Sequence, residues 1–354
     1  MRTEASSFAI ISPRKDFLFF FASISVVLVV WFASSQLQVP GFAVLAAVAV
    51  VSNGPHLIST WTRVYLDRRE WASRKTATVL VPALIALAVL LVTLGLRREG
   101  TRLLNSIILY WATWHFVAQN WGILRIYQRK SGEPLEGLAV RLERPLLVLS
   151  ALFCLLHRLA TGPRVLFGVE VFYPAIPVAA VRALLVPLVA MLALLVVLRV
   201  RARHAPTARA AWVRLAFIVC SFFGFFVPFQ LITSDDTSAF AAAACWHGLQ
   251  YLGMVRHYNL NAWRGGVDER ARLISWLSQP GWRRGFLYWC LLMALAGAVY
   301  VVIFALSVVT PWPFYTWAAV VWVSLTLSHY WLDGVIWKLR RPELAARVGI
   351  APAS

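Results

Sequence analysis

Four of the seven histidines, His56, His115, His247 and His329, lie deep within apolar segments long enough to cross a membrane. An imidazole placed in the hydrocarbon interior is costly and usually has a function. A cationic residue follows these histidines after 7, 10, 9 and 9 residues, in chain order. At about 1.5 Å of helix rise per residue, this spread equals about 4.5 Å in depth. Because neutral imidazole both tolerates burial and binds divalent transition metals, the pattern predicts one metal site with these four side chains as ligands.

Polar residues one helical turn after the histidines are candidates for orienting the ligand rings and for catalysis. The candidate catalytic residues are Asp333 (four after His329), Gln119 (four after His115), and Gln250 and Tyr251 (three and four after His247). Thr60 stands in the same relation to His56.

Other assignments of these polar residues stay open. Asp333 has an alternative partner in Lys338 or Arg340, since it lies near the inner boundary of its segment. His257, next to a basic residue at the end of its segment, is a candidate fifth ligand. His157 and His204 are expected not to bind metal.

The composition indicates which elements position these residues. The chain has 354 residues, of which 60% are hydrophobic and 14% charged, and this is too apolar for one soluble core. We predict an all-α, polytopic transmembrane helix bundle that forms a single domain over residues 1–354. Ten spans of bilayer length are expected at residues 17–34, 41–62, 77–96, 103–124, 145–160, 179–198, 212–232, 238–256, 285–309 and 314–337. The four cysteines lie singly within spans and are expected to be reduced packing residues.

The net charge of +19 would suggest a nucleic-acid partner in a soluble protein, but the positions of the basic residues argue against it. With a cytoplasmic N-terminus and ten alternating spans, 28 of the 34 Lys and Arg fall on the inner side. We therefore predict a multi-pass protein with both termini cytoplasmic. The lipid bilayer is the expected partner, no nucleic acid is expected, and the oligomeric state stays open.

One internal repeat links two of the histidine-bearing segments. The pattern Gln119-x-x-Gly122-x-x-Arg125-x-Tyr127 recurs as Gln250-x-x-Gly253-x-x-Arg256-x-Tyr258. Both copies run in the same direction across the membrane, which indicates a parallel duplication. In an earlier span, Gly54-Pro55-His56 predicts a local break, because proline cannot donate to the carbonyl one turn back.

A metal held only by neutral histidines keeps its positive charge and can bind dioxygen or water at open positions. Fe(II) suits oxygen chemistry and zinc suits hydrolysis. Hydrolysis normally needs a carboxylate base and a water path, and Asp333 is the one acidic residue near this layer. We therefore favour non-haem iron acting on an apolar small molecule from the bilayer. Aromatic residues that would line its path, with interfacial packing as the alternative, are Trp111, Trp114, Trp121, Trp246, Tyr251, Trp331 and Trp337.

Two short motifs resemble a known family. Pro55-His56 after a stretch of small residues, and His115-Phe116 in a later span, resemble the first two histidine motifs of the Brp/Blh-type bacterial carotene dioxygenases. The resemblance implies a multi-pass enzyme of the bacterial inner membrane in which four histidines hold the iron that splits a polyene with dioxygen. The later ligands depart from that pattern, since His247 lacks a close His-x-x-x-His partner and His329 lies two spans onward.

The last span resembles the tail of uncharacterised bacterial integral membrane proteins, through His329-Tyr330-x-x-Asp333-Gly334-x-Ile336-Trp337-Lys338. Two other functions fit the same histidines. A haem electron carrier would use two histidines on facing helices as axial ligands. A proton-coupled transporter would use them as proton relays, with the parallel repeat and the broken span as its scaffold.

Overall fold

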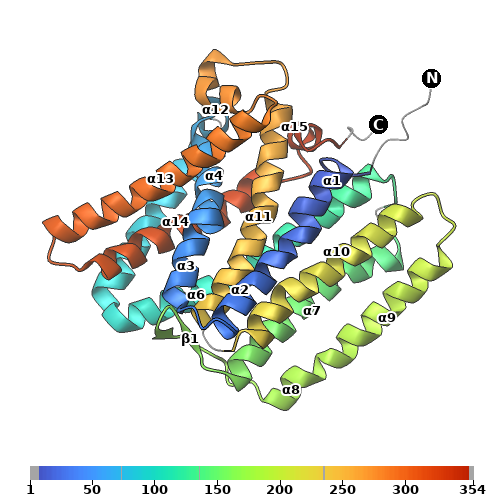
Figure 1. The fold of residues 1–354 in the computed structure, drawn as a ribbon, viewed down its shortest axis with the longest axis horizontal. Coiled ribbons are helices and arrows are strands. Elements are labelled where there is room, and N and C mark those ends of the chain that lie inside the picture. The colour runs from blue at the N-terminus through green and yellow to red at the C-terminus, as the bar shows by residue number, and fades with distance from the viewer. Residues whose placement is uncertain (1–7, 73, 135, 234–235, 351–354) are drawn as a thin grey trace.

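The computed structural model describes residues 8–72, 74–134, 136–233 and 236–350, and these residues form a bundle of helices (Figure 1). The longer helices are α2 (Ser25–Ser35), α3 (Gly41–Val48), α4 (Gly54–Tyr65), α6 (Val81–Lys130), α7 (Leu138–Thr161), α9 (Leu185–Arg201), α10 (Ala208–Phe226), α11 (Asp236–Ala262), α13 (Trp282–Val309) and α14 (Phe314–Ile336). Short α-helices are α1 (Pro13–Asp16), α5 (Arg68–Ala72), α8 (Val178–Ala183), α12 (Arg272–Leu277) and α15 (Pro342–Arg347). π-helical segments are η1 (Phe17–Phe21), η3 (Ala49–Asn53), η4 (Thr76–Leu80) and η5 (Val227–Leu231), and 3₁₀ segments are η2 (Ala22–Ile24) and η6 (Glu269–Ala271).

Among the described residues, seven helices are long and apolar enough to cross a membrane, so the chain is a multi-pass membrane protein. They are Pro13–Ser35, Gly41–Tyr65, Thr76–Lys130, Val178–Arg201, Ala208–Leu231, Trp282–Val309 and Phe314–Ile336. The prediction of ten spans exceeds this number for two reasons. Two predicted spans lie within the single segment Thr76–Lys130, and the helices α7 and α11, at the predicted spans 145–160 and 238–256, are not among the seven.

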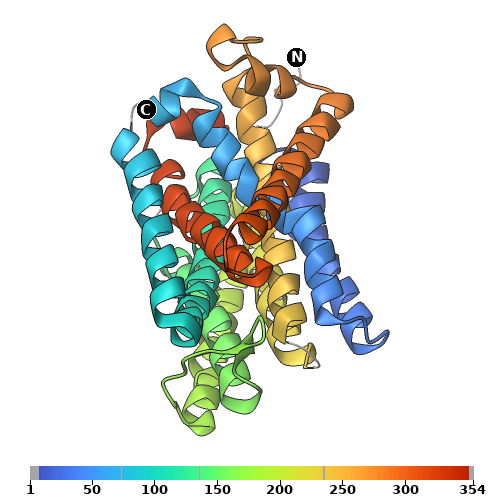
Figure 2. The ribbon, with the colours of Figure 1, turned by 90° about the vertical axis from the view of Figure 1, so that its left-hand side faces the viewer.

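Helix α6 changes direction within its length. Its backbone leaves the helical conformation at Arg97, where φ is 48° and ψ is −118°. Two adjacent residues of α14 contact both parts of this chain segment. Trp331 donates from its indole to the Ala77 carbonyl at 3.0 Å, and the ring centroid of Tyr330 lies 6.1 Å from that of Trp111. In a straight helix, Ala77 and Trp111 are 34 steps apart and would be separated by about 51 Å. The chain therefore doubles back at Arg97, and the two arms run side by side in Figure 2.

The beginning and end of the described chain meet at one end of the bundle (Figure 1). Lys130 donates to the Ile10 carbonyl at 3.2 Å, and the Tyr127 hydroxyl donates to Asp16 at 2.8 Å. Asn261, at the end of α11, donates to the Arg347 carbonyl of α15 at 2.8 Å. The opposite end carries a small antiparallel hairpin of β1 (Val165–Leu166) and β2 (Val169–Glu170).

A buried ionic network joins three helices. Glu143 of α7 accepts hydrogen bonds from Arg199 of α9 at 2.7 Å and from Arg214 of α10 at 2.9 Å. Glu133, in the loop after α6, accepts from Arg199 at 2.9 Å and pairs with Arg214. Because Glu143 is 1% and Arg214 0% exposed, each charge depends on the others for compensation. The network fixes α9 and α10 against α7.

Candidate metal centre

Four helices bring the four histidines to one point. His56 lies on α4, His115 on α6, His247 on α11 and His329 on α14, and all four side chains are buried. One ligand atom from each lies within 4.8 Å of those of the others. The His56 ring centroid is 4.8 Å from that of His247 and 4.4 Å from that of His329. The His115 centroid is 4.9 Å from each of the same two rings. The imidazoles therefore form a closed ring of four around a common centre.

The spacing of these nitrogen atoms fits a metal ion after small side-chain movements. With metal–nitrogen bonds of about 2.0–2.1 Å, two ligands of one ion lie at most about 4.2 Å apart. The 4.8 Å limit exceeds that by less than 1 Å. Among the described residues, His56 Nδ1 and both ring nitrogens of His247 have no hydrogen-bond partner. Since an unpaired buried polar atom is costly, a coordinated ion would remove that cost.

The local backbone brings His56 close to α11. The π-helix η3 ends at Asn53, directly before Gly54-Pro55-His56, so the predicted break is present as a change of helix type. Such π segments often occur at functional sites. On α11, a Cβ added at Gly248 would lie 2.6 Å from Ser52 Oγ and 3.3 Å from His56 Cβ. Glycine at position 248 therefore allows the two helices to approach beside both of their histidines.

A hydrogen-bonded chain holds the His329 ring. Thr60 Oγ1 lies 2.8 Å from His329 Nδ1 and 3.2 Å from Asp333 Oδ1. Tyr251 donates to the same carboxylate oxygen at 2.7 Å. If Thr60 donates to Asp333, its oxygen is left to accept the proton on His329 Nδ1. This arrangement leaves the lone pair of His329 Nε2 directed toward the centre, which is the tautomer that metal ligation requires.

The other oxygen of Asp333 faces the histidines. Asp333 Oδ2 lies 3.7 Å from the Nε2 atoms of both His115 and His329. These two Nε2 atoms are themselves 3.2 Å apart. The carboxylate therefore lies next to the centre, instead of pairing with Lys338 or Arg340 as the alternative interpretation proposed.

Gln119 and Gln250 contact each other and not the rings expected from helical spacing. Gln119 donates to the His247 carbonyl at 3.1 Å and to Gln250 Oε1 at 3.2 Å. Helical spacing predicted that each glutamine contacts the histidine one turn earlier on its own helix. Instead, Gln119 of α6 contacts residues of α11. Thr60 likewise contacts His329, although its sequence spacing pointed to His56.

A buried cation lies beyond Tyr251. The Arg63 guanidinium carbon is 3.9 Å from the ring centroids of both Tyr258 and Trp337. Trp337 in turn donates from its indole to the Tyr251 hydroxyl at 3.1 Å. The predicted histidine, hydroxyl and carboxylate residues are therefore connected to a cation that the sequence did not assign to the site.

The aromatic neighbours of the histidines were also missed as parts of the site. The Phe116 ring stacks on His247, with centroids 4.2 Å apart, and the Tyr330 ring lies 4.6 Å from His115. Each directly follows a histidine in the sequence, but nothing in that adjacency predicts which ring it contacts. These rings help to exclude water around the cluster.

The remaining histidines lie outside the cluster. His257 hydrogen-bonds to Asn261 at 3.2 Å and is not among the four grouped residues. His157 contacts Gln230 at 2.7 Å, and His204 is exposed. The structure thus separates these three from the four predicted ligands.

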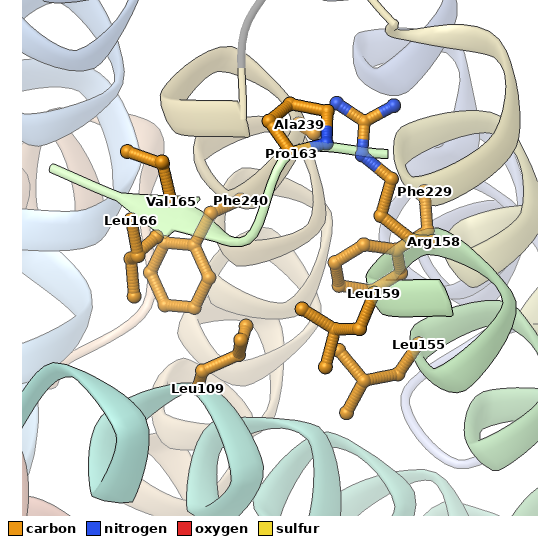
Figure 3. Close-up of a pocket in the computed structure, with 10 residues that line it drawn as sticks. All are labelled: Leu109, Leu155, Arg158, Leu159, Pro163, Val165, Leu166, Phe229, Ala239 and Phe240. Atoms are coloured by element: carbon orange, nitrogen blue, oxygen red, sulfur yellow. The ribbon is translucent and has the colours of Figure 1, made fainter. Parts of the chain in front are cut away.

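A cavity of about 620 Å³ opens onto the histidine cluster between α6 and α14. It reaches His115, Asp333 and Tyr251, and its wall contains Trp111 and Trp331. A second cavity, near Arg158 and Phe240 (Figure 3), holds only about 20 Å³, enough for about one water molecule. Of these two cavities, only the larger one has room for an organic substrate.

The chain matches no family model, and no curated protein or solved structure matches it significantly. The geometry and chemistry of the site are therefore the guide to its function.

Proposed function

We propose that the protein is a membrane-embedded oxygenase in which His56, His115, His247 and His329 hold a non-haem Fe(II) ion. Its substrate is an apolar lipid or polyene that reaches the ion from the bilayer. The observation that carries this proposal is the convergence of four buried imidazoles on one centre, with ligand atoms within 4.8 Å of one another. When bound, the ion supplies dioxygen chemistry at the coordination positions that the histidines leave open.

The protein's own residues prepare the site for this chemistry. Thr60 and Asp333 fix the tautomer of His329 through the hydrogen bonds described above. Asp333 Oδ2, 3.7 Å from two ligand nitrogens, is placed to hold a proton beside the reacting atoms. Gln119 holds α6 to α11 behind His247. Phe116 and Tyr330 pack against the rings and exclude water from the centre.

Iron is favoured over zinc because the cavity is lined mainly by apolar and aromatic side chains, which suits an apolar substrate better than hydrolytic water. A bare ion is favoured over haem because a macrocycle needs a free plane between its two axial histidines. Here rings approach the centre from four helices, and neighbouring centroids are 4.4 to 4.9 Å apart. Carotene cleavage is one reaction within this class, and the motifs at His56 and His115 support it.

We further propose that the protein lies in the bacterial inner membrane with both termini cytoplasmic. The common end formed by α1, α15 and the last turn of α6 supports this placement, because basic residues such as Lys130 and Arg347 gather there. Antiparallel arms of α6 joined at Arg97 also fit the expected reversal between residues 96 and 103.

Metal analysis with an optical spectrum tests this function. The purified protein should contain about one iron per chain, lack a Soret band, and consume dioxygen when supplied with a polyene or unsaturated lipid. A strong Soret band would favour the haem carrier. Proton-gradient-driven transport by metal-free protein in vesicles would favour the transporter.

A further inference from the structure

The cavity beside the histidines is elongated along the helices. Its lining runs from Trp111 to Ile126 on α6, and these two positions, fifteen helical steps apart, are separated by about 22 Å. On the other side it runs from Tyr330 on α14 to Leu339 beyond the end of that helix. The volume of about 620 Å³ is that of a site for one small organic molecule. A single extended chain fits this shape better than a two-chain lipid.

One side of the cavity opens toward lipid. Trp111, Trp114 and Trp331 are 41%, 48% and 37% exposed, although they lie within membrane-spanning segments. Gly122 and Gly334 also line the cavity, and a Cβ added at either meets no atom within 4 Å. The two glycines thus leave open space between α6 and α14 through which a chain can enter.

The end of the cavity away from the histidines is cationic. Lys338 lines it directly after α14, and Arg129 donates to the carbonyl of the adjacent lining residue Leu339 at 2.9 Å. Lys338 lies two residues beyond the end of α14, and the helix rises about 10 Å from His329 to its last residue, Ile336. An anionic group held at Lys338 would therefore place the middle of a long chain beside the histidines.

We propose that this cavity binds a single-chain amphiphile with a carboxylate head, of the long-chain fatty acid type. Lys338 binds the head, and the chain lies between Gly122 and Gly334 with its middle at the histidine cluster. This inference rests on the proposed function for the fate of the chain, but the binding itself needs no metal. Lys338 and the two glycines are accordingly specificity-determining residues.

Binding to the metal-free, full-length protein in nanodiscs tests the proposal. Oleate should displace a fluorescent fatty acid at least about tenfold better than methyl oleate does, because a charge-assisted hydrogen bond to Lys338 is lost in the ester. Lys338→Gln should remove that difference, whereas Arg340→Gln should keep it. Gly334→Leu should weaken binding of both compounds, whereas Gly297→Leu should not, since Gly297 is a helical glycine with open space that does not line the cavity.

Three results would overturn the proposal. They are equal displacement by acid and ester, unchanged binding in Gly334→Leu, and equally strong displacement by phosphatidylglycerol, which would indicate a two-chain phospholipid. Iron content and dioxygen consumption, measured on the same preparations, distinguish a failure of the proposed function from a failure of this inference. If the unmodified protein binds oleate but holds no iron and consumes no dioxygen, only the proposed function is contradicted. If it holds iron and consumes dioxygen but does not bind oleate through Lys338, only this inference is contradicted.

Discussion

Gln119 Nε2 donates a hydrogen bond to Gln250 Oε1 at 3.2 Å, and these two residues occupy equivalent positions in the internal repeat. A side-chain hydrogen bond thus joins the duplicated segments beside the histidine cluster. Their glycines have diverged, because Gly122 faces the open cavity, whereas a Cβ at Gly253 would lie 2.6 Å from the Phe19 ring. One copy therefore provides access to the centre and the other provides packing.

Substitution of Gly248 should separate two of the ligand-bearing helices. In Gly248→Ala, the added Cβ would lie 2.6 Å from Ser52 Oγ and 3.3 Å from His56 Cβ. Either Ser52 loses its hydrogen bond to the Cys245 carbonyl, or α11 moves away from η3 and α4, and both changes disturb the approach of His247 to His56. We expect lower iron content and a lower melting temperature in detergent. Gly297→Ala is the matched control, since its Cβ meets nothing within 4 Å. Unchanged iron content in Gly248→Ala would contradict the assigned contact.

The carboxylate of Asp333 should control metal affinity through the ligand that it orients. Asp333→Asn keeps the shape of the side chain but weakens acceptance from Thr60 and Tyr251. Loss of such outer partners typically lowers metal affinity about 10- to 100-fold. Thr60→Val should have a similar effect, because it removes the hydroxyl beside His329 Nδ1. Titration with Fe(II) under anaerobic conditions measures both, and affinities equal to the unmodified protein would argue against this orienting role.

The ionic network should determine stability without affecting the metal. Glu143→Gln leaves Arg199 and Arg214 buried with one fewer negative charge. Removing one partner of a buried pair typically costs about 3–5 kcal/mol in the free energy of unfolding. We expect a markedly lower melting temperature but the same iron content per folded chain. Glu136→Gln, a change outside this network, is the control, and equal melting temperatures for the two variants would refute the role of Glu143.

The sequence predicted much of the fold because membrane helices have a strong local signal. Apolar length located the longer helices, including the two arms joined at Arg97, but some of their ends only roughly, since α7 begins at Leu138 and not at residue 145. The number of predicted spans exceeds the seven apolar helices partly because α7 and α11 combine membrane length with polar residues such as Glu143 and Gln250. Buried polar residues lower the hydropathy of central helices, so composition alone cannot count them reliably.

The site was predictable only in part. Matching depth indicated that His56, His115, His247 and His329 could share a layer, and the structure brings them together. The partners of the rings were not predictable, because helical spacing assigns Thr60 to His56, whereas tertiary packing places it on His329. Arg63 and Phe116 were missed for the same reason, since their contacts form only when separate helices pack.

The central claim, that four histidines share one ion, is tested most directly by elemental mass spectrometry of purified variants. We expect about one iron per chain in the unmodified protein, and a sharp loss in His56→Ala, His115→Ala, His247→Ala and His329→Ala. His157→Ala and His204→Ala should retain the metal, because both histidines lie outside the cluster. Unchanged metal content in any two of the four cluster variants, in protein that remains folded, would contradict a shared site.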